Sequence, residues 1–184
     1  MMKKIIYILL LLVSLNETAK AQVNTAASQT INMSMSNAVE ISFTATGTTS
    51  GNNVNLTFNT ANNYASGVES DAQEMKVRSN KNFTVTVKSN AANFTYSGTT
   101  SPAPTMAVAN VLGLMVTANT TSGAVSSPFS TTSYSSITSS NQNLITNGSR
   151  GGNQKFSVKY KASPDFNFPS GIYTVSIVYT ATQN

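Results

Sequence analysis

Near its end the chain reads Tyr173-Thr174-Val175-Ser176-Ile177-Val178-Tyr179-Thr180. A large apolar side chain occupies every second position from Tyr173 to Tyr179, and hydroxyl-bearing residues fill most of the positions between them. Successive side chains of a β-strand point to opposite faces, so this alternation predicts a strand with one buried face and one face in water.

The same two-residue period recurs along most of the chain. It predicts further strands around Ile31, Met33 and Met35; Val39, Ile41 and Phe43; Val54, Leu56 and Phe58; Met75 and Val77; Phe83, Val85 and Val87; Phe94 and Tyr96; and Phe156, Val158 and Tyr160. Residues 111–117 are more continuously apolar, so period alone does not separate their two faces. No window of eleven or more residues has a comparable helical pattern.

Eight to ten short strands separated by Gly, Asn, Ser and Pro predict an all-β fold, a single immunoglobulin-like antiparallel β-sandwich. A closed barrel is the less favoured alternative at this length, and a parallel sheet would need helical crossovers that the sequence does not show. Thr84, Thr86 and Lys88 occupy the alternate positions of one predicted strand, as in a sheet with one solvated face.

Two stretches lack strand patterns. Residues 119–142 are mostly Ser, Thr, Asn and Gly, and their sizeable anchors include Phe129, Tyr134 and Ile137, so we expect a long surface loop with at most one weak edge strand. Residues 99–105 contain Pro102 and Pro104 and predict a second, partly extended loop.

The first 21 residues have the organisation of a secretory signal peptide. Lys3 and Lys4 precede the apolar run 5–13, and Ala19-Lys20-Ala21 places small residues two positions apart before Gln22. A membrane anchor is the alternative, but the run is shorter than the ~20 apolar residues that a spanning helix needs. We therefore expect residues 1–21 to be removed, leaving residues 22–184 as one exported β-sandwich domain in the periplasm, at the cell surface or outside the cell, with no membrane span.

The composition excludes most catalytic chemistry. The 184 residues include no His, Cys or Trp, so no imidazole base, thiolate nucleophile, disulfide or zinc knuckle exists. Ser, Thr and Asn account for 73 residues. Removing the leader takes three of the eleven basic and one of the six acidic residues, and the remaining net charge of +3 is too small and too spread to predict nucleic-acid binding. A Ser–Lys dyad has no supporting motif, so we expect no enzyme and no cofactor.

Glu69, Asp71 and Glu74 form the one acidic cluster. Carboxylates are suitable calcium ligands, but their spacing does not match the twelve-residue calcium loop, and a solvated acidic turn is the alternative.

Lys155, Lys159 and Lys161 share one face of a predicted strand, and Lys76 and Arg78 lie on another. If the two strands are neighbours, the lysines present a face for an anionic polysaccharide. The alternative is that lysines on an exposed strand discourage edge-to-edge aggregation.

Four aromatic residues in or near predicted loops, Tyr64, Tyr96, Phe129 and Tyr134, suit stacking on sugar rings, or else they cover the ends of the two sheets. A module that binds a glycan or a cell-wall polymer is therefore the alternative to a structural protein.

The closing run Pro169-Ser170-Gly171-Ile172-Tyr173 and the alternating residues after it resemble the last strand of exported bacterial β-sandwich subunits. The pattern is similar to spore-coat-U-like and chaperone–usher pilus proteins and to the terminal strand of WxL-type cell-wall-binding domains. The run 148–151 before Phe156 also resembles secreted proteins of gliding-type Gram-negative bacteria.

Resemblance to pilus subunits implies a fold that is completed by a neighbour's N-terminal strand, with Gly171, Tyr173, Val175, Ile177 and Tyr179 in the closing strand. The donor would lie in residues 23–35, where Ile31, Met33 and Met35 alternate. The sequence departs from these families because Tyr179 is not penultimate, and no cysteine pair and no Trp are present.

These patterns together predict a secreted, non-catalytic structural or adhesion protein, a pilus- or coat-like subunit. Its expected partners are other surface proteins or copies of itself, with a polysaccharide as a further partner. Whether the N-terminal strand pairs in its own chain or in another stays open at this point.

Overall fold

The structure is a computed structural model that describes residues 25–44 and 53–184. The predicted leader, residues 1–21, lies outside the described residues. The compact part of the chain comprises Ser36–Asn184, and the residues up to Met35 form a separate unit.

The described residues form twelve strands and two short helices. In chain order these are β1 (Val39–Phe43), α2 (Ala61–Ser66), β2 (Val68–Glu69), β3 (Gln73–Ser79), β4 (Phe83–Ser89), β5 (Thr95–Ser97), α3 (Val108–Val111), β6 (Leu112–Asn119), β7 (Ala124–Val125), β8 (Ser135–Ser136), β9 (Gln142–Gly148), β10 (Gly151–Ala162), β11 (Ile172–Thr174) and β12 (Ile177–Gln183). The number exceeds the eight to ten expected because five of these strands have only two or three residues.

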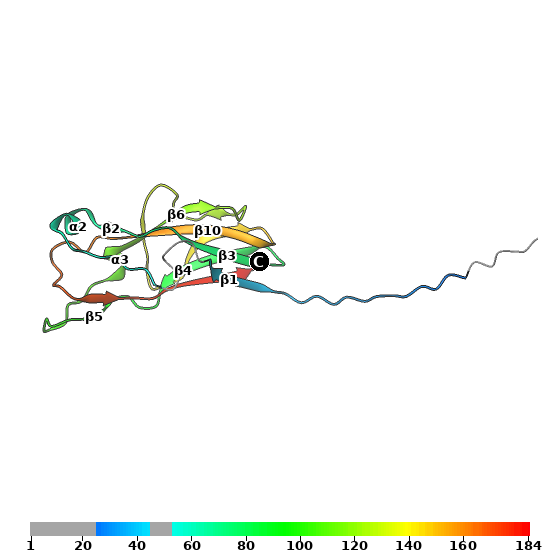
Figure 1. Cartoon of the computed structure of the whole chain (residues 1–184), viewed down its shortest axis with the longest axis horizontal. Coiled ribbons are helices and arrows are strands. Elements are labelled where there is room, and N and C mark those ends of the chain that lie inside the picture. Colours follow the sequence, from blue (N-terminus) through cyan, green and yellow to red (C-terminus); the bar gives the residue numbers. More distant parts are fainter. Residues whose placement is uncertain (1–24, 45–52) are drawn as a thin grey trace, which may run out of the picture. The chain divides into compact units, whose positions relative to one another are not determined.

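The fold is an antiparallel β-sandwich, as the alternation predicted. One sheet has the order β1-β3-β10-β6-β8, with β2 also paired to β10. The facing sheet has the order β12-β4-β9-β7. Figure 1 shows β10 and β12 in different layers. All of these strand pairs are antiparallel, so no helical crossover is needed. The short turns from β3 to β4 and from β9 to β10 lead from one sheet to the other.

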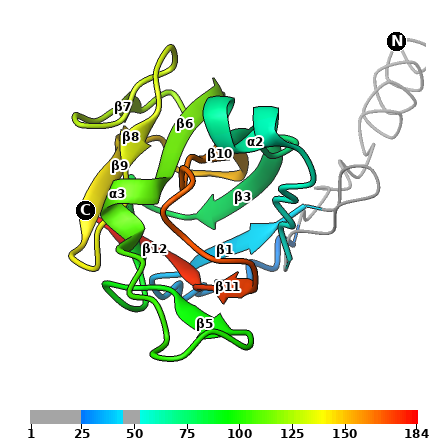
Figure 2. The ribbon, with the colours of Figure 1, turned by 90° about the vertical axis from the view of Figure 1, so that its left-hand side faces the viewer.

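The two sides of the sandwich end differently. On one side the last strands are β1 and β12, which lie near each other. On the opposite side they are β7 and β8, of two residues each. A third piece, β11 paired with β5, extends the β12 side beyond the main sheets (Figure 2).

The core lies between the sheets and consists of the inward-facing residues of the long strands. Residues that are almost completely buried include Met75, Val77, Phe83, Val85, Val87, Leu114, Val116, Leu144, Ile145, Phe156 and Val158. Burial of such side chains contributes about 1.5–3 kcal/mol each, which is the main source of stability in a domain of this size. The outward positions Thr84, Thr86 and Lys88 are half-buried, in agreement with the sequence.

Strand β9 was not predicted, and its conformation explains why. It pairs with β4 through two register shifts, one of them between Val85 and Thr86. The consecutive residues Leu144 and Ile145 are therefore both fully buried, which breaks the two-residue period. An irregularity of this kind is invisible to a search for alternation.

Two predicted strands do not form ladders among the described residues. Residues 25–38 contain no strand and are all exposed, so the expectation of a strand at Ile31, Met33 and Met35 is not met within this chain. Residues 53–58 are extended, with Val54, Leu56 and Phe58 half-buried and the residues between them exposed, but they belong to no sheet.

The final predicted strand is divided in two. Tyr173 belongs to β11 and pairs with Tyr96, whereas Ile177 begins β12 and pairs with Ser89. The division falls at Val175-Ser176, where Ser176 N–H donates to Asn90 Oδ1 (3.0 Å). Ser176 O still accepts from the Asn90 N–H (2.9 Å), so a side-chain acceptor replaces one of the two backbone bonds where the chain passes from one partner strand to another.

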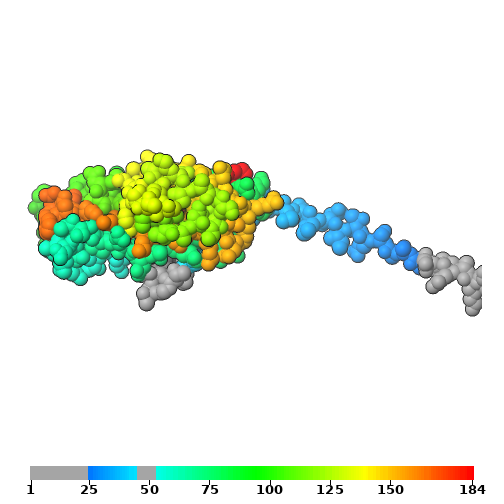
Figure 3. Space-filling view, turned by 90° about the horizontal axis from the view of Figure 1, so that it is seen from above, coloured from blue at the N-terminus to red at the C-terminus, as the bar shows by residue number. Residues whose placement is uncertain are grey.

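The long Ser/Thr-rich segment 119–142 lies at the surface, as predicted, and is anchored by three buried residues, Thr121, Phe129 and Ile137. Phe129 and Ile137 are buried in the core, and β7 and β8 attach the segment to the edges of both sheets. Figure 3 shows the green-to-yellow residues of this region in the middle of the visible face. The expected single weak edge strand is thus replaced by two very short ones.

The two described helices are short. Helix α2 begins at Thr60, whose hydroxyl accepts from the Asn63 N–H, and it ends at Gly67. Neither α2 nor α3 has the length and hydropathy needed to cross a membrane.

Candidate functional site

An open, largely apolar groove of about 980 Å³ lies at the end of the sandwich where β1 ends and β12 begins. It begins near Phe43 and Ile177, where β1 and β12 end and start, and extends past β11. Its lining includes Val54, Leu56, Phe58, Tyr64, Phe94, Met106, Tyr160, Phe168, Tyr173 and Val175. Such an elongated apolar surface suits a partner that is itself extended and apolar on one face.

Two stretches of chain form the long walls of the groove. Residues 54–58 form one wall and make no backbone hydrogen bond to any other described residue. Residues 168–177 form the other wall, and within it β11 pairs on one side only, with β5. Unpaired strand edges are templates for the addition of another strand.

The predicted sheet-closing residues Gly171, Tyr173, Val175 and Ile177 all lie on the second wall. Gly171 is required there because a Cβ at this position would overlap the Tyr96 ring. Tyr179 lies further along β12 and packs edge-to-face on Phe43, with ring centroids 6.1 Å apart. The structure therefore brings these five residues together along one edge.

A pair of tyrosine hydroxyls lies beneath the groove. The Tyr160 and Tyr179 hydroxyls are 2.6 Å apart. Burial raises the pKa of Tyr160 to about 12, and the Tyr179 hydroxyl lowers it in part. Burial and the neighbouring Tyr160 raise the pKa of Tyr179 well above 10. Both phenols therefore hold their protons more tightly in the folded chain than in the unfolded chain.

This pair predicts a loss of stability in alkali. Below pH 10 the two phenols are protonated in both the folded and the unfolded chain, and their full contribution to the free energy of unfolding is present. Between pH 10 and 12 the unfolded chain loses its phenolic protons first, so the free energy of unfolding falls by about 1.4 kcal/mol per pH unit for Tyr160. Urea unfolding of the original chain and of Tyr160→Phe/Tyr179→Phe at pH 9 to 12 checks this. Equal slopes for the two proteins would contradict it.

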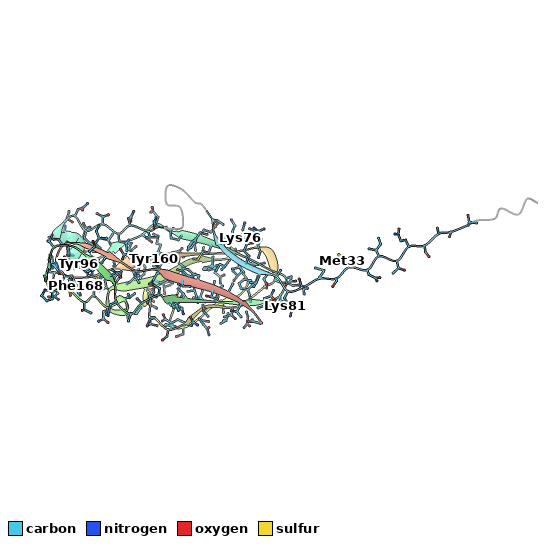
Figure 4. All side chains as sticks on the ribbon, turned by 90° about the horizontal axis from the view of Figure 1, so that it is seen from below. Met33, Lys76, Lys81, Tyr96, Tyr160 and Phe168 are labelled. Carbon is cyan, nitrogen blue, oxygen red and sulfur yellow. The ribbon has the colours of Figure 1, made fainter. Side chains whose placement is uncertain are left out.

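An aromatic row continues the groove at its β11 end. Tyr64 lies between Phe58 and Phe166, with ring centroids 5.4 and 5.3 Å away, and Phe166 is 67% exposed. Tyr96 packs on Tyr173 at 5.0 Å. Figure 4 shows Tyr96 and Phe168 at the same end of the compact part.

The N-terminal segment 25–35 has the complementary character. Ile31, Met33 and Met35 are 85%, 82% and 76% exposed, and they alternate with Asn32 and Ser34. None of residues 25–35 belongs to a strand. The segment therefore has the alternating apolar pattern of a β-strand but belongs to no sheet.

The lysines predicted to form a polyanion face are largely neutralised by carboxylates. Strands β3 and β10 are neighbours, and Lys155 lies opposite Lys76. However, Lys155 Nζ is 2.9 Å from Glu74 and Lys161 Nζ is 3.9 Å from Glu69. Lys159 makes no ion pair within the described residues. The three lysines share one face of β10, but it carries both signs of charge.

The acidic cluster is dispersed by the same ion pairs. Glu69, Asp71 and Glu74 do not form a group that could hold a metal ion, among the residues that the structure describes. Glu74 also accepts from the Thr44 hydroxyl at 2.6 Å, and this bond, followed by Lys155, lowers the pKa of Glu74. Glu69 and Glu74 thus connect neighbouring strands rather than converge on one point.

One of the aromatic residues proposed for sugar stacking is unavailable, and a second, Tyr134, is half-buried. Phe129 is buried in the core. The Tyr134 hydroxyl is buried without a partner among the described residues, and burial together with Glu69 raises the pKa of Tyr134 to about 12. Tyr64 and Tyr96 remain at the groove.

Sequence reasoning found the closing strand but not the groove. Val54, Leu56 and Phe58 were predicted as a strand, not as the wall of a site. The amides of Asn80 and Gln183, which hold the start of β1, carried no sequence signal because Asn is abundant throughout the chain.

No protein-family model matches the chain, and none of the curated proteins matches it.

Proposed function

We propose that this protein is an exported, non-catalytic structural subunit that assembles with copies of itself at the cell surface or outside the cell. The N-terminal segment of one copy adds as a strand to the groove of the next, as in a pilus- or coat-like assembly. The observation that carries the proposal is the coexistence of an apolar groove between unpaired edges and an exposed, alternating apolar segment.

The N-terminal segment and the groove agree in length and chemistry. Five residues from Ile31 to Met35 span about 14 Å, and the wall 54–58 spans a similar length at about 3.4 Å per residue. Each apolar side chain transferred into the groove contributes about 1.5–3 kcal/mol, and the walls supply main-chain hydrogen bonds. Asn32 and Ser34 remain on the solvent face.

The mass of the chain in solution tests this proposal. Light scattering after size exclusion of residues 22–184 is expected to show polymers at micromolar concentration. Ile31→Ser/Met33→Ser/Met35→Ser is expected to yield monomers with the same circular dichroism spectrum. The matched variant Asn32→Ser/Ser34→Ala changes the other face of the segment and is expected to polymerise. A monomeric original chain would overturn the proposal.

A second candidate function is the retention of a neutral glycan or cell-wall polymer. It is favoured by the exposed Phe166 ring, which stacks on Tyr64 with an interplanar angle of 22°. Aromatic faces of this kind suit the apolar faces of sugar rings. Co-sedimentation with insoluble polysaccharide that is lost in Phe166→Ala would support it, and equal sedimentation of both proteins would reject it.

A further inference from the structure

The start of β1 is fixed by two side-chain amides. Asn80 Nδ2 donates to Ser36 O (2.8 Å), and Ala38 N–H donates to Asn80 Oδ1 (2.9 Å). Gln183 Nε2 donates to Ala38 O and to Asn80 Oδ1, both at 2.8 Å. We call Asn80 and Gln183 the clamp.

The clamp and the groove lie toward opposite ends of the sandwich. The clamp joins the β3–β4 turn and the last residues of β12 to Ser36–Ala38. The groove starts near Phe43, at the far end of β1, and continues to Phe168. Figure 4 labels Lys81, next to Asn80, and Phe168 at opposite ends of the compact part.

Because of this separation, the segment has the wrong length to fill the groove of its own chain. A tight turn at Asn37 would set Met35 beside Val39 and Ile31 beside Phe43, so the apolar residues would lie along β1. The groove itself would receive residues 25–30, which are Thr, Ala, Ala, Ser, Gln and Thr. None of these has an apolar side chain larger than alanine.

We propose that the clamp, together with the short link Ser36–Ala38 that it holds, prevents the N-terminal segment from reaching the groove of its own chain. The segment then binds the groove of a second copy. This inference rests on the proposed assembly. Asn80 and Gln183 act as positioning residues, because they contact the link Ser36–Ala38 and not the groove. A second copy is free of the length restriction, so its groove accepts Ile31, Met33 and Met35 directly.

The test is to lengthen the chain between the N-terminal segment and the clamp. A twelve-residue Gly/Ser insertion between Met35 and Ser36 adds up to about 40 Å, more than β1 and the 53–58 wall laid end to end at about 3.4 Å per residue. A segment tethered in this way has an effective concentration near the millimolar range, so at micromolar protein the chain is expected to fill its own groove and become a monomer. Hydrogen exchange at Ile31–Met35 is expected to be slow in that monomer.

The matched control places the same insertion between Ala26 and Ala27, where it adds length without releasing Ile31–Met35. This chain is expected to polymerise like the original. If the original chain is monomeric, the proposed function fails. Suppose instead that the original chain polymerises. If the chain lengthened at Ser36 then also polymerises, or gives monomers with fast exchange at Ile31–Met35, the role of the clamp is wrong but the proposed assembly stands.

A clamp variant tests the two amides themselves. Asn80→Ala/Gln183→Ala frees Ser36 and Asn37, about 7 Å of reach, whereas Ala38 stays bonded to the backbone N–H of residue 80. The monomer fraction is therefore expected to rise, with slowed exchange at Ile31–Met35. Lys81→Ala/Thr182→Ala changes the neighbouring exposed residues and is expected to match the original chain. An unchanged monomer fraction in the clamp variant would overturn the role of the clamp.

Discussion

A chain carrying Leu56→Arg is expected to remain folded and to form no polymers. Leu56 lies in the middle of the groove wall, is half-buried and belongs to no sheet, so its replacement removes a contact with the edge of the core but breaks no strand ladder. An incoming apolar strand would lose a contact and would bury a guanidinium without a partner. Together these effects are expected to weaken association at least about 100-fold, as judged from about 3 kcal/mol of lost burial and desolvation. Light scattering over a concentration series measures it.

Thr57→Arg is the matched control, because it adds the same charge at the next residue, which is exposed. It is expected to polymerise. Polymers formed equally by Leu56→Arg and Thr57→Arg would contradict the assignment of the groove as the acceptor.

Mixing two inactive variants gives a sharper form of the same prediction. Leu56→Arg retains its donor segment but lacks an acceptor, whereas Ile31→Ser/Met33→Ser/Met35→Ser retains its acceptor but lacks a donor. A mixture is expected to stop at a 1:1 heterodimer, since the complex has no competent end left. Two separate monomers in the mixture would contradict strand addition between copies.

The largest effect on stability is expected for Phe156→Ala. Phe156 is 1% exposed, lies on β10 in the middle of its sheet and packs against the Tyr179 ring at 6.4 Å. Removal of a buried Phe side chain leaves a cavity that neighbouring strands fill only in part, so the free energy of unfolding is expected to fall by about 3–5 kcal/mol. Urea unfolding in the monomeric Ile31→Ser/Met33→Ser/Met35→Ser background measures it without interference from assembly.

Phe166→Ala in the same background is the control. Phe166 has the same side chain but is mostly exposed and stacks on Tyr64 alone, so a loss below about 1 kcal/mol is expected. Comparable losses for the two variants would contradict the placement of the core.

Alternation predicted the sandwich because most of its long strands keep a regular period. In β3, in β4 and in β10 from Phe156 onward, every second side chain is buried, Met75 and Phe83 among them. Strand β9 escaped detection because its register shifts bury two consecutive residues. Local sequence does not encode where a neighbouring strand bulges.

The same pattern also predicted strands at Ile31–Met35 and at residues 54–58, which form no ladder within the described chain. Alternation reports that one face of a segment is apolar, but not which edge it joins. The groove and the clamp depend on which strand edges remain free and on where Asn80 and Gln183 meet, and both are set by residues distant in sequence. Local sequence patterns therefore predict neither the groove nor the clamp.

The unequal sides of the sandwich determine the form that an assembly can take. Strands β7 and β8 close one side with two residues each, too few to template a further ladder. In the proposed assembly, the described residues of each copy offer one groove to receive a neighbour and one segment to donate. Growth by this route is linear and unbranched, and it would give filaments of uniform width in negative-stain electron micrographs.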